Sequence, residues 1–193
     1  MARIGLKNFK YGKLTEGTKN TYATPAVLAG AIESKVSLDI NEASLYSDDI
    51  LKEQDSSFKK GTLTLGVDDD DDAVFAELLG QSATEKEVGS GDTKESIKEY
   101  TSNSSNNAEY VGFGHIVTKM INGVRKYKVE FFHKVKFKPF IADAKTKGES
   151  LEFTTPSVEG TIMTLANGDW EKHATFSNEE NAKTYLDSLF VQE

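Results

Sequence analysis

Five consecutive aspartates, Asp68 to Asp72, form the densest group of potential metal ligands in the chain. The first, third and fifth of them have the spacing of the first ligands in an EF-hand loop, whose oxygen ligands suit calcium. Such a loop also needs glycine at its sixth position and glutamate at its twelfth, where this chain has Ala73 and Leu79. The sequence therefore excludes an EF-hand. Two interpretations stay open: a weak surface calcium site, and the one we favour, an acidic helix start or solvated charge run.

The other residue types that commonly perform chemistry show no catalytic arrangement. The chain has no cysteine, which excludes disulfides, thiolate nucleophiles and sulfur-ligated metals. His115, His133 and His173 fall on different expected strands without metal-binding spacing, and no serine has the glycine pattern of a nucleophile elbow. The segment from Gly112 to Gly114 lacks the third glycine and the following helix of a dinucleotide-binding loop. We therefore predict that the protein is not an enzyme and has no catalytic, cofactor or metal site.

The aspartate run belongs to a longer acidic segment, residues 39–72, which carries the whole charge bias of the chain. This segment holds eleven acidic and three basic side chains, and its charge of −8 equals the formal charge of the protein. The rest of the chain contains 20 of the 31 acidic and 20 of the 23 basic side chains. A surface that concentrates one sign of charge commonly faces something outside the monomer.

Composition narrows the function classes further. A length of 193 residues fits one domain, and 11 Phe and 7 Tyr supply a core although only 37% of residues are hydrophobic. The acidic balance disfavours a protein that holds nucleic acid through a basic face. We find no signal peptide and no apolar stretch long enough to span a bilayer, so we expect assembly in a cytoplasm without membrane insertion.

Alternation of apolar and polar residues predicts a mainly β fold that positions these charges. Val36 to Ile40 and Leu63 to Val67 both have the period of two that is typical of half-buried strands. Between them we expect a loop, residues 44–60, in which large apolar side chains are spaced irregularly among charges. Those apolar residues, which must pack on their own domain or on a neighbour, are Leu45, Tyr46, Ile50, Leu51 and Phe58.

Two helices and one polar loop are expected beside the strands. Residues 73–79 are predicted to form a short helix that Asp72 caps at its start and Gly80 at its end. The C-terminus has a capping-box pattern from Ser177 to Glu180, followed by apolar residues at helical spacing. Residues 81–109 are rich in polar residues and have almost no large apolar side chains, so we expect a long mobile loop or insertion within a single domain 1–193.

Two β-hairpins are predicted in the second half of the chain. One joins strands on either side of Asn122-Gly123, the preferred pair for a type I′ turn, and the other joins 158–165 to 170–176 through Asn167-Gly168. The strand after Asn122-Gly123 places alternate residues from Tyr127 to Phe137 on one face and a basic row from Lys126 to Lys138 on the other. This row is either a solvated face, or lysine protection of an edge strand, or a surface that meets the acidic segment of a neighbouring subunit, with Lys134 and Lys136 as candidate interface residues.

Three segments resemble a known family over most of the chain. They read SLYSDDILKEQDSSFKKGTLTLGVDDD at 44–70, YVGFGHIVTKMINGVRKYKVEFFHKVKF at 110–137 and TKGESLEFTTPSVEGTIM at 146–163. These segments, together with the opening ARIGLKNFKYGKL, resemble the major tail proteins, or tail-tube proteins, of long-tailed siphophages and prophages of Gram-positive bacteria. The resemblance is weakest in 81–109.

The resemblance implies a structural virion protein. In that family a β-sandwich flanked by a helix forms rings, usually hexameric, that stack into a tube around a tape-measure protein. The implied partners are further copies of the chain, the tape-measure protein and the tail terminator or distal tail protein. DNA passes through the tube without specific binding, and no membrane is involved.

On this basis we expect loop 44–60 to contact a neighbouring subunit through its five apolar residues, and Asp68, Asp69 and Asp70 to face the lumen. The alternative is a monomeric β-sandwich module that binds carbohydrate or another surface ligand, which would need an exposed aromatic platform.

Overall fold

The computed structural model of the protein describes residues 2–142, 146 and 154–191. Strands predominate, with one internal and one C-terminal helix, which confirms the expected mainly β fold. In chain order the elements are β1 (Ala2–Thr15), β2 (Thr21–Tyr22), β3 (Ala26–Val27), β4 (Ala31–Ser47), β5 (Ile50–Val67), α1 (Asp72–Leu79), β6 (Ser82–Val88), the 3-10 turn η1 (Gly91–Thr93), β7 (Glu95–Thr101), β8 (Tyr110–Ile121), β9 (Val124–Phe137), β10 (Ser157–Met163), β11 (Glu171–Phe176) and α2 (Glu179–Ser188).

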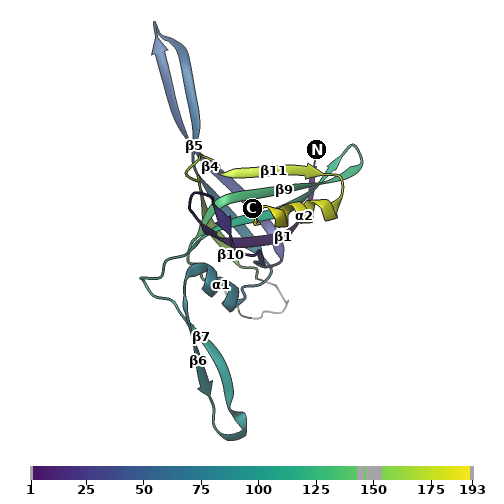
Figure 1. Cartoon of the computed structure of the whole chain (residues 1–193). Helices are drawn as coiled ribbons and strands as arrows, with labels where there is room; N and C mark the ends of the chain where they lie inside the picture. The colour runs from purple at the N-terminus through teal and green to yellow at the C-terminus, as the bar shows by residue number, and fades with distance from the viewer. Residues whose placement is uncertain (1, 143–145, 147–153, 192–193) are drawn as a thin grey trace.

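One antiparallel sheet with the strand order β2-β1-β8-β9-β10-β5-β4 forms the body. The sheet folds over on itself, so that the start of β4 approaches β1 and the two halves enclose the main core. Phe9, Leu63, Phe113 and Ile162, all fully buried, come from four different strands of this core. The arrangement is a sandwich-like body in which β4 is an edge strand (Figure 1).

A β-bulge in β9 reverses which side chains face the core. Between the pairs Val111–Val135 and Phe113–Phe132, β9 contains one residue more than β8. Because side chains alternate along a strand, the extra residue moves Val135 to the face opposite that of Phe131. Phe131 accordingly packs in the cluster with α2, whereas Val135 packs in the main core. The predicted single apolar face from Tyr127 to Phe137 is therefore wrong.

The second predicted hairpin is also wrong, although its turn exists. β10 and β11 do not pair with each other; both run antiparallel to β9, one after the other along the same edge. The Asn167-Gly168 turn, in which Gly168 has a φ of 90°, is a short excursion between these two strands. The Asn122-Gly123 hairpin is confirmed, with φ values of 49° and 78° that match a type I′ turn.

Helix α2 covers the outer face of β8 and β9. Ala182, Leu186, Leu189 and Phe190 pack there against the sheet, as the apolar spacing predicts. Gly114 permits the close approach, because a Cβ at this position would lie 2.5 Å from Cδ1 of Leu186.

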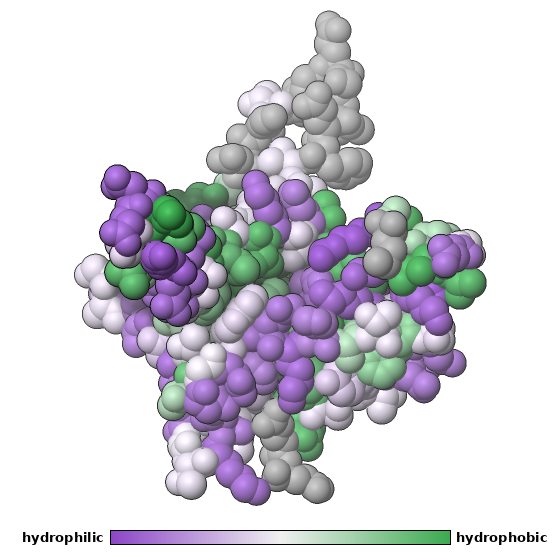
Figure 2. All heavy atoms as spheres, turned by 90° about the horizontal axis from the view of Figure 1, so that it is seen from above, coloured by the Kyte–Doolittle hydropathy of each residue, from purple (hydrophilic) through white to green (hydrophobic). Residues whose placement is uncertain are grey.

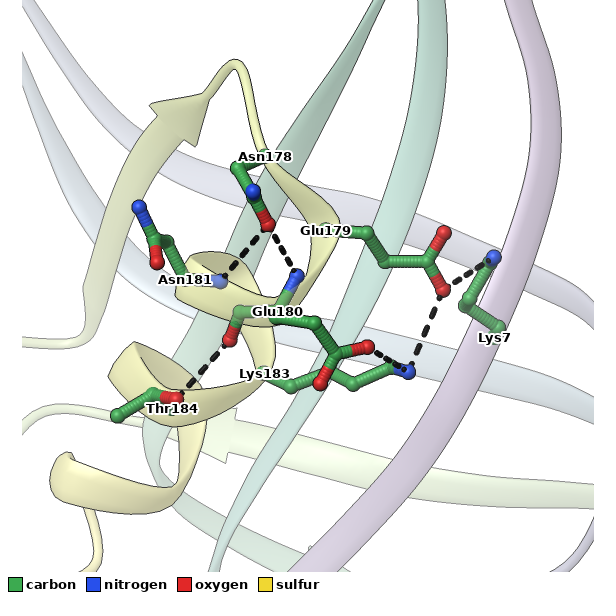
Figure 3. A network of polar contacts seen from close by, with 7 residues as sticks. All are labelled: Lys7, Asn178, Glu179, Glu180, Asn181, Lys183 and Thr184. Atoms are coloured by element: carbon green, nitrogen blue, oxygen red, sulfur yellow. Dashed lines mark hydrogen bonds and ion pairs between the residues drawn. The ribbon is translucent and has the colours of Figure 1, made fainter.

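The helix caps differ by one residue from the prediction. Asn178, not Ser177, caps α2: its Oδ1 accepts hydrogen bonds from the backbone N–H groups of Glu180 and Asn181 (Figure 3). Asp71 rather than Asp72 caps α1, and Gly80 ends that helix in the left-handed conformation as expected.

Both segments predicted to be loops are instead β-hairpins. Residues 44–60 belong to β4 and β5, which pair almost to the turn at Asp48-Asp49. Most of the polar stretch 81–109 forms a second hairpin, β6–β7. The two hairpins project from opposite ends of the body (Figure 1). Their polar composition indicated loops, but cross-strand backbone hydrogen bonds form regardless of composition, and a hairpin outside the core has few apolar positions to reveal it.

Candidate functional site

The outer part of the β4–β5 hairpin carries a group of large, exposed apolar side chains. We call residues 40–58 of this hairpin the arm. Every residue from 35 to 57 is exposed, so the arm has no core of its own. Near its tip, Leu45, Tyr46, Ile50 and Leu51 are 46–65% exposed. A two-stranded hairpin alone is only marginally stable in water, and grouped exposed apolar residues mark interaction sites. The arm therefore has the properties of a contact surface.

The turn at the end of the arm has an unusual composition. Asp48 and Asp49 have φ values of 54° and 61°, so both adopt the left-handed conformation of a type I′ turn. Asn122-Gly123 makes the equivalent turn between β8 and β9 with the residues that tolerate this conformation best. At the arm tip the same left-handed conformation is adopted by two aspartates, which tolerate it less well than Asn-Gly and which place two carboxylates side by side. Such local strain commonly accompanies a functional position.

Four of the five predicted contact residues are available on the arm, but Phe58 is not. Its ring stacks on Trp170 of the same chain, with centroids 4.4 Å apart and planes inclined by 4°. Phe58 therefore holds the base of the arm on the body. The same contact covers the single tryptophan, so Trp170 does not form the open aromatic platform that a carbohydrate-binding module would need.

Lys134 and Lys136 make contacts within the subunit. Nζ of Lys134 lies 2.6 Å from Oε2 of Glu16 and 4.4 Å from the centre of the Tyr110 ring. Nζ of Lys136 lies 2.6 Å from Oδ1 of Asn107 and 5.1 Å from the same ring. The basic row of β9 is therefore interrupted at the bulge, and these two lysines are a poor choice for contact with a neighbour.

The aspartate run is exposed, and part of it caps the backbone. Oδ1 of Asp68 accepts a hydrogen bond from the N–H of Gly30 at 2.6 Å, and Asp69 accepts one from the N–H of Asp70. Asp71 accepts two at the start of α1. These contacts agree with an acidic helix start. Among the described residues, no three His, Asp or Glu side chains converge in a way that would hold a metal ion.

A buried charge cluster was missed by the sequence reasoning. Glu130 of β9, whose side chain is 7% exposed, lies 3.1 Å from Nη2 of Arg3 and 2.6 Å from Nζ of Lys128. Nε2 of His115 is 3.2 Å from its second oxygen, although neither nitrogen of this ring has a partner in hydrogen-bonding geometry among the described residues. The sequence did contain a sign of this cluster, because Glu130 stands among the apolar residues Val129, Phe131 and Phe132.

The ionisation of Glu130 follows from these neighbours. Burial raises the pKa of Glu130, but the contacts with His115 and Lys128 outweigh it and lower the pKa to about 2. Glu130 borders a cleft of about 270 Å³ between β4 and β9 that Arg3, Val36, Leu38 and Trp170 also line. The cluster offers a fixed, ionised carboxylate between cations. It is suited to binding charge rather than to proton transfer at neutral pH.

No protein-family model matches the sequence, and no curated protein is significantly similar to it. In the part of the chain that the structure describes, neither helix has the length and apolarity needed to cross a bilayer.

Proposed function

We propose that this protein is a self-assembling structural subunit of a phage tail tube. The observation that carries the proposal is the arm, a two-stranded ribbon that extends from a compact β body with large apolar residues near its tip. On the face of the molecule from which the arm projects, hydrophobic side chains lie exposed among hydrophilic ones (Figure 2). A contact with a second subunit would remove them from water, which contributes roughly 25 cal/mol per Å² of apolar area.

Several further features support the same proposal. The mainly β body flanked by a C-terminal helix is what the resemblance to tail-tube proteins implies. The arm and the β6–β7 hairpin project from opposite ends of the body, which suits contacts along a stack of rings (Figure 1). In this proposal the rings are hexameric and enclose the tape-measure protein. The exposed carboxylates of Asp69 and Asp70 face the lumen, where like charge would keep passing DNA from adhering.

Removing apolar area from the arm tests the proposal. In Tyr46→Ser/Ile50→Ser the subunit should fold normally, because neither side chain packs on the body, but tubes should not form. Negative-stain microscopy and sedimentation velocity measure assembly, and circular dichroism measures folding. The unfolding midpoint should change by no more than about 2 °C, as is usual for exposed positions.

The matched control removes exposed apolar residues elsewhere. Ile141→Ser/Val191→Ser should assemble like the wild type, since these exposed side chains lie outside the arm. Normal tubes from the arm variant would contradict the role of the arm. Featureless small particles from the wild-type protein at every concentration would instead favour the monomeric binding module.

A further inference from the structure

Four cations gather at the end of the body where β8 turns into β9, although the protein as a whole is acidic. Arg3 pairs directly with Lys119, and Lys119 pairs directly with Lys126, so three adjacent strands place a cation at the same level. Lys128 follows Lys126 on the same face. We call Arg3, Lys119, Lys126 and Lys128 the cradle.

The charge of the cradle is not balanced within the subunit. Like charges directly opposite each other destabilise a sheet. Across residues 2–142 and 154–191, no carboxylate lies within ion-pair distance of Lys119 or Lys126, and Glu130 is shared by Arg3 and Lys128. Burial and the neighbouring cations Lys128 and Arg3 lower the pKa of Lys119, against the opposing effect of Glu130. Glu171, which lines the same cleft as Arg3 and Lys128, lies 3.3 Å from His173 and makes no ion pair with the cradle.

The arm tip has the complementary properties. It presents the carboxylates of Asp48 and Asp49 beside exposed apolar residues, and the cradle has exposed Val124 on its own face, two residues before Lys126. The eight residues from Asn41 to Asp48 carry the tip about 25 Å from the body. In Figure 1 the arm rises from one side of the body, while the N-terminus and the β8–β9 turn lie at the other. The two surfaces therefore do not meet within one subunit.

We propose that the acidic arm tip of one copy of this chain binds in the cradle of the next copy. This inference rests on the proposed function and specifies which surface receives the arm. The contact joins two different surfaces, so it is heterologous and propagates from subunit to subunit. It also accounts for the row of opposed cations and the adjacent carboxylates at the tip, because each group of like charges gains opposite charges only in the assembly.

Two charge-removing variants test the contact without harming the fold. Asp48→Asn/Asp49→Gly recreates the turn sequence of residues 122–123, so the hairpin itself should become more stable. Lys119→Gln/Lys126→Gln removes like-charge repulsion, which offsets the loss of the exposed hydrogen bond from Lys126 to Ser177, so the monomer should lose little stability. Each variant should nevertheless raise the critical concentration for assembly by about tenfold or more, measured by sedimentation.

The combined variant separates direct contact from independent effects. If tip and cradle touch, the four-residue variant should assemble about as well as either double variant, because the interaction is already lost in each. Additive effects, or normal assembly of either double variant, would overturn the inference.

Disulfide trapping provides a second readout, which the cysteine-free chain makes specific. An Asp49→Cys chain assembled with a Lys126→Cys chain should form a cross-linked dimer on mild oxidation. Asp49→Cys with Lys183→Cys, on the exposed side of α2, should not. Tubes of normal appearance with no preference between the two pairs would refute the contact but keep the proposed function. A wild-type protein that stays monomeric at every concentration would refute both.

Discussion

At the scale of single residues, Glu130 shows how a buried charge is kept ionised. Its carboxylate is held between Arg3, Lys128 and His115 with almost no access to solvent. Because its pKa of about 2 lies below the ordinary value of 4.5, the folded protein binds this proton less readily than the unfolded chain does. The resulting stabilisation is complete above about pH 4.5 and is lost as the pH falls towards 2, and it amounts to about 3 kcal/mol.

We therefore expect Glu130→Gln to lower the free energy of unfolding by about 3 kcal/mol at pH 7, and by progressively less as the pH falls below 4.5. Urea unfolding of variant and wild type at several pH values measures this difference, and titration of other groups cancels in the comparison. Glu159→Gln is the control, since Glu159 pairs with Lys138 at a largely exposed site and should cost less than about 1 kcal/mol. A loss for Glu130→Gln that does not depend on pH would show that the carboxylate is not held ionised.

At the scale of elements, α2 begins at Asn178 because the side chain of that residue satisfies two backbone donors. Lys7 of β1 then ties the first turn to the sheet, with Nζ 2.7 Å from Oε1 of Glu179 (Figure 3). Asn178→Ala should lower the free energy of unfolding by about 1 kcal/mol, as measured by urea unfolding. Ser177→Ala is the matched control, and it should have a smaller effect because Oγ of Ser177 accepts from Nζ of Lys126 instead. Equal losses would restore serine as the cap.

Features of the fold that depend on neighbouring residues were predicted from the sequence, whereas features that depend on distant parts of the chain were not. The Asn122-Gly123 turn, the Gly80 cap and the apolar stripe of α2 depend on neighbouring residues, and the sequence predicted all three. The bulge in β9 and the placement of β10 and β11 along one edge depend on partners far away in the chain, which a pattern in one segment does not report. The candidate site divides in the same way. Apolar residues among the charges of 44–60 singled out Tyr46 and Ile50, but the sequence left open whether they pack on their own domain or on a neighbour. Their exposure, the Phe58–Trp170 stack and the grouping of Arg3 with Lys119 and Lys126 require the fold.

At the scale of the whole molecule, the arm and the body should differ in stability until assembly couples them. The arm has cross-strand hydrogen bonds but no buried side chains between 41 and 57, so its backbone amides should open locally without unfolding the body. In a tube, subunit contacts would have to be broken first. Hydrogen exchange of the free subunit and of the assembled protein therefore reports on assembly directly.

We expect amides of residues 41–57 to exchange quickly in the free subunit and at least about 100-fold more slowly in tubes, which corresponds to roughly 3 kcal/mol of added local stability. The core strand around Phe113, already fully buried in the subunit, should change far less and is the internal control. The β8–β9 turn beside the cradle should gain protection together with the arm, since one contact would cover both. Protection of the arm without protection of that turn would mean that the arm binds another surface of its neighbour. Unchanged exchange in the arm would mean that the tube is held together without it.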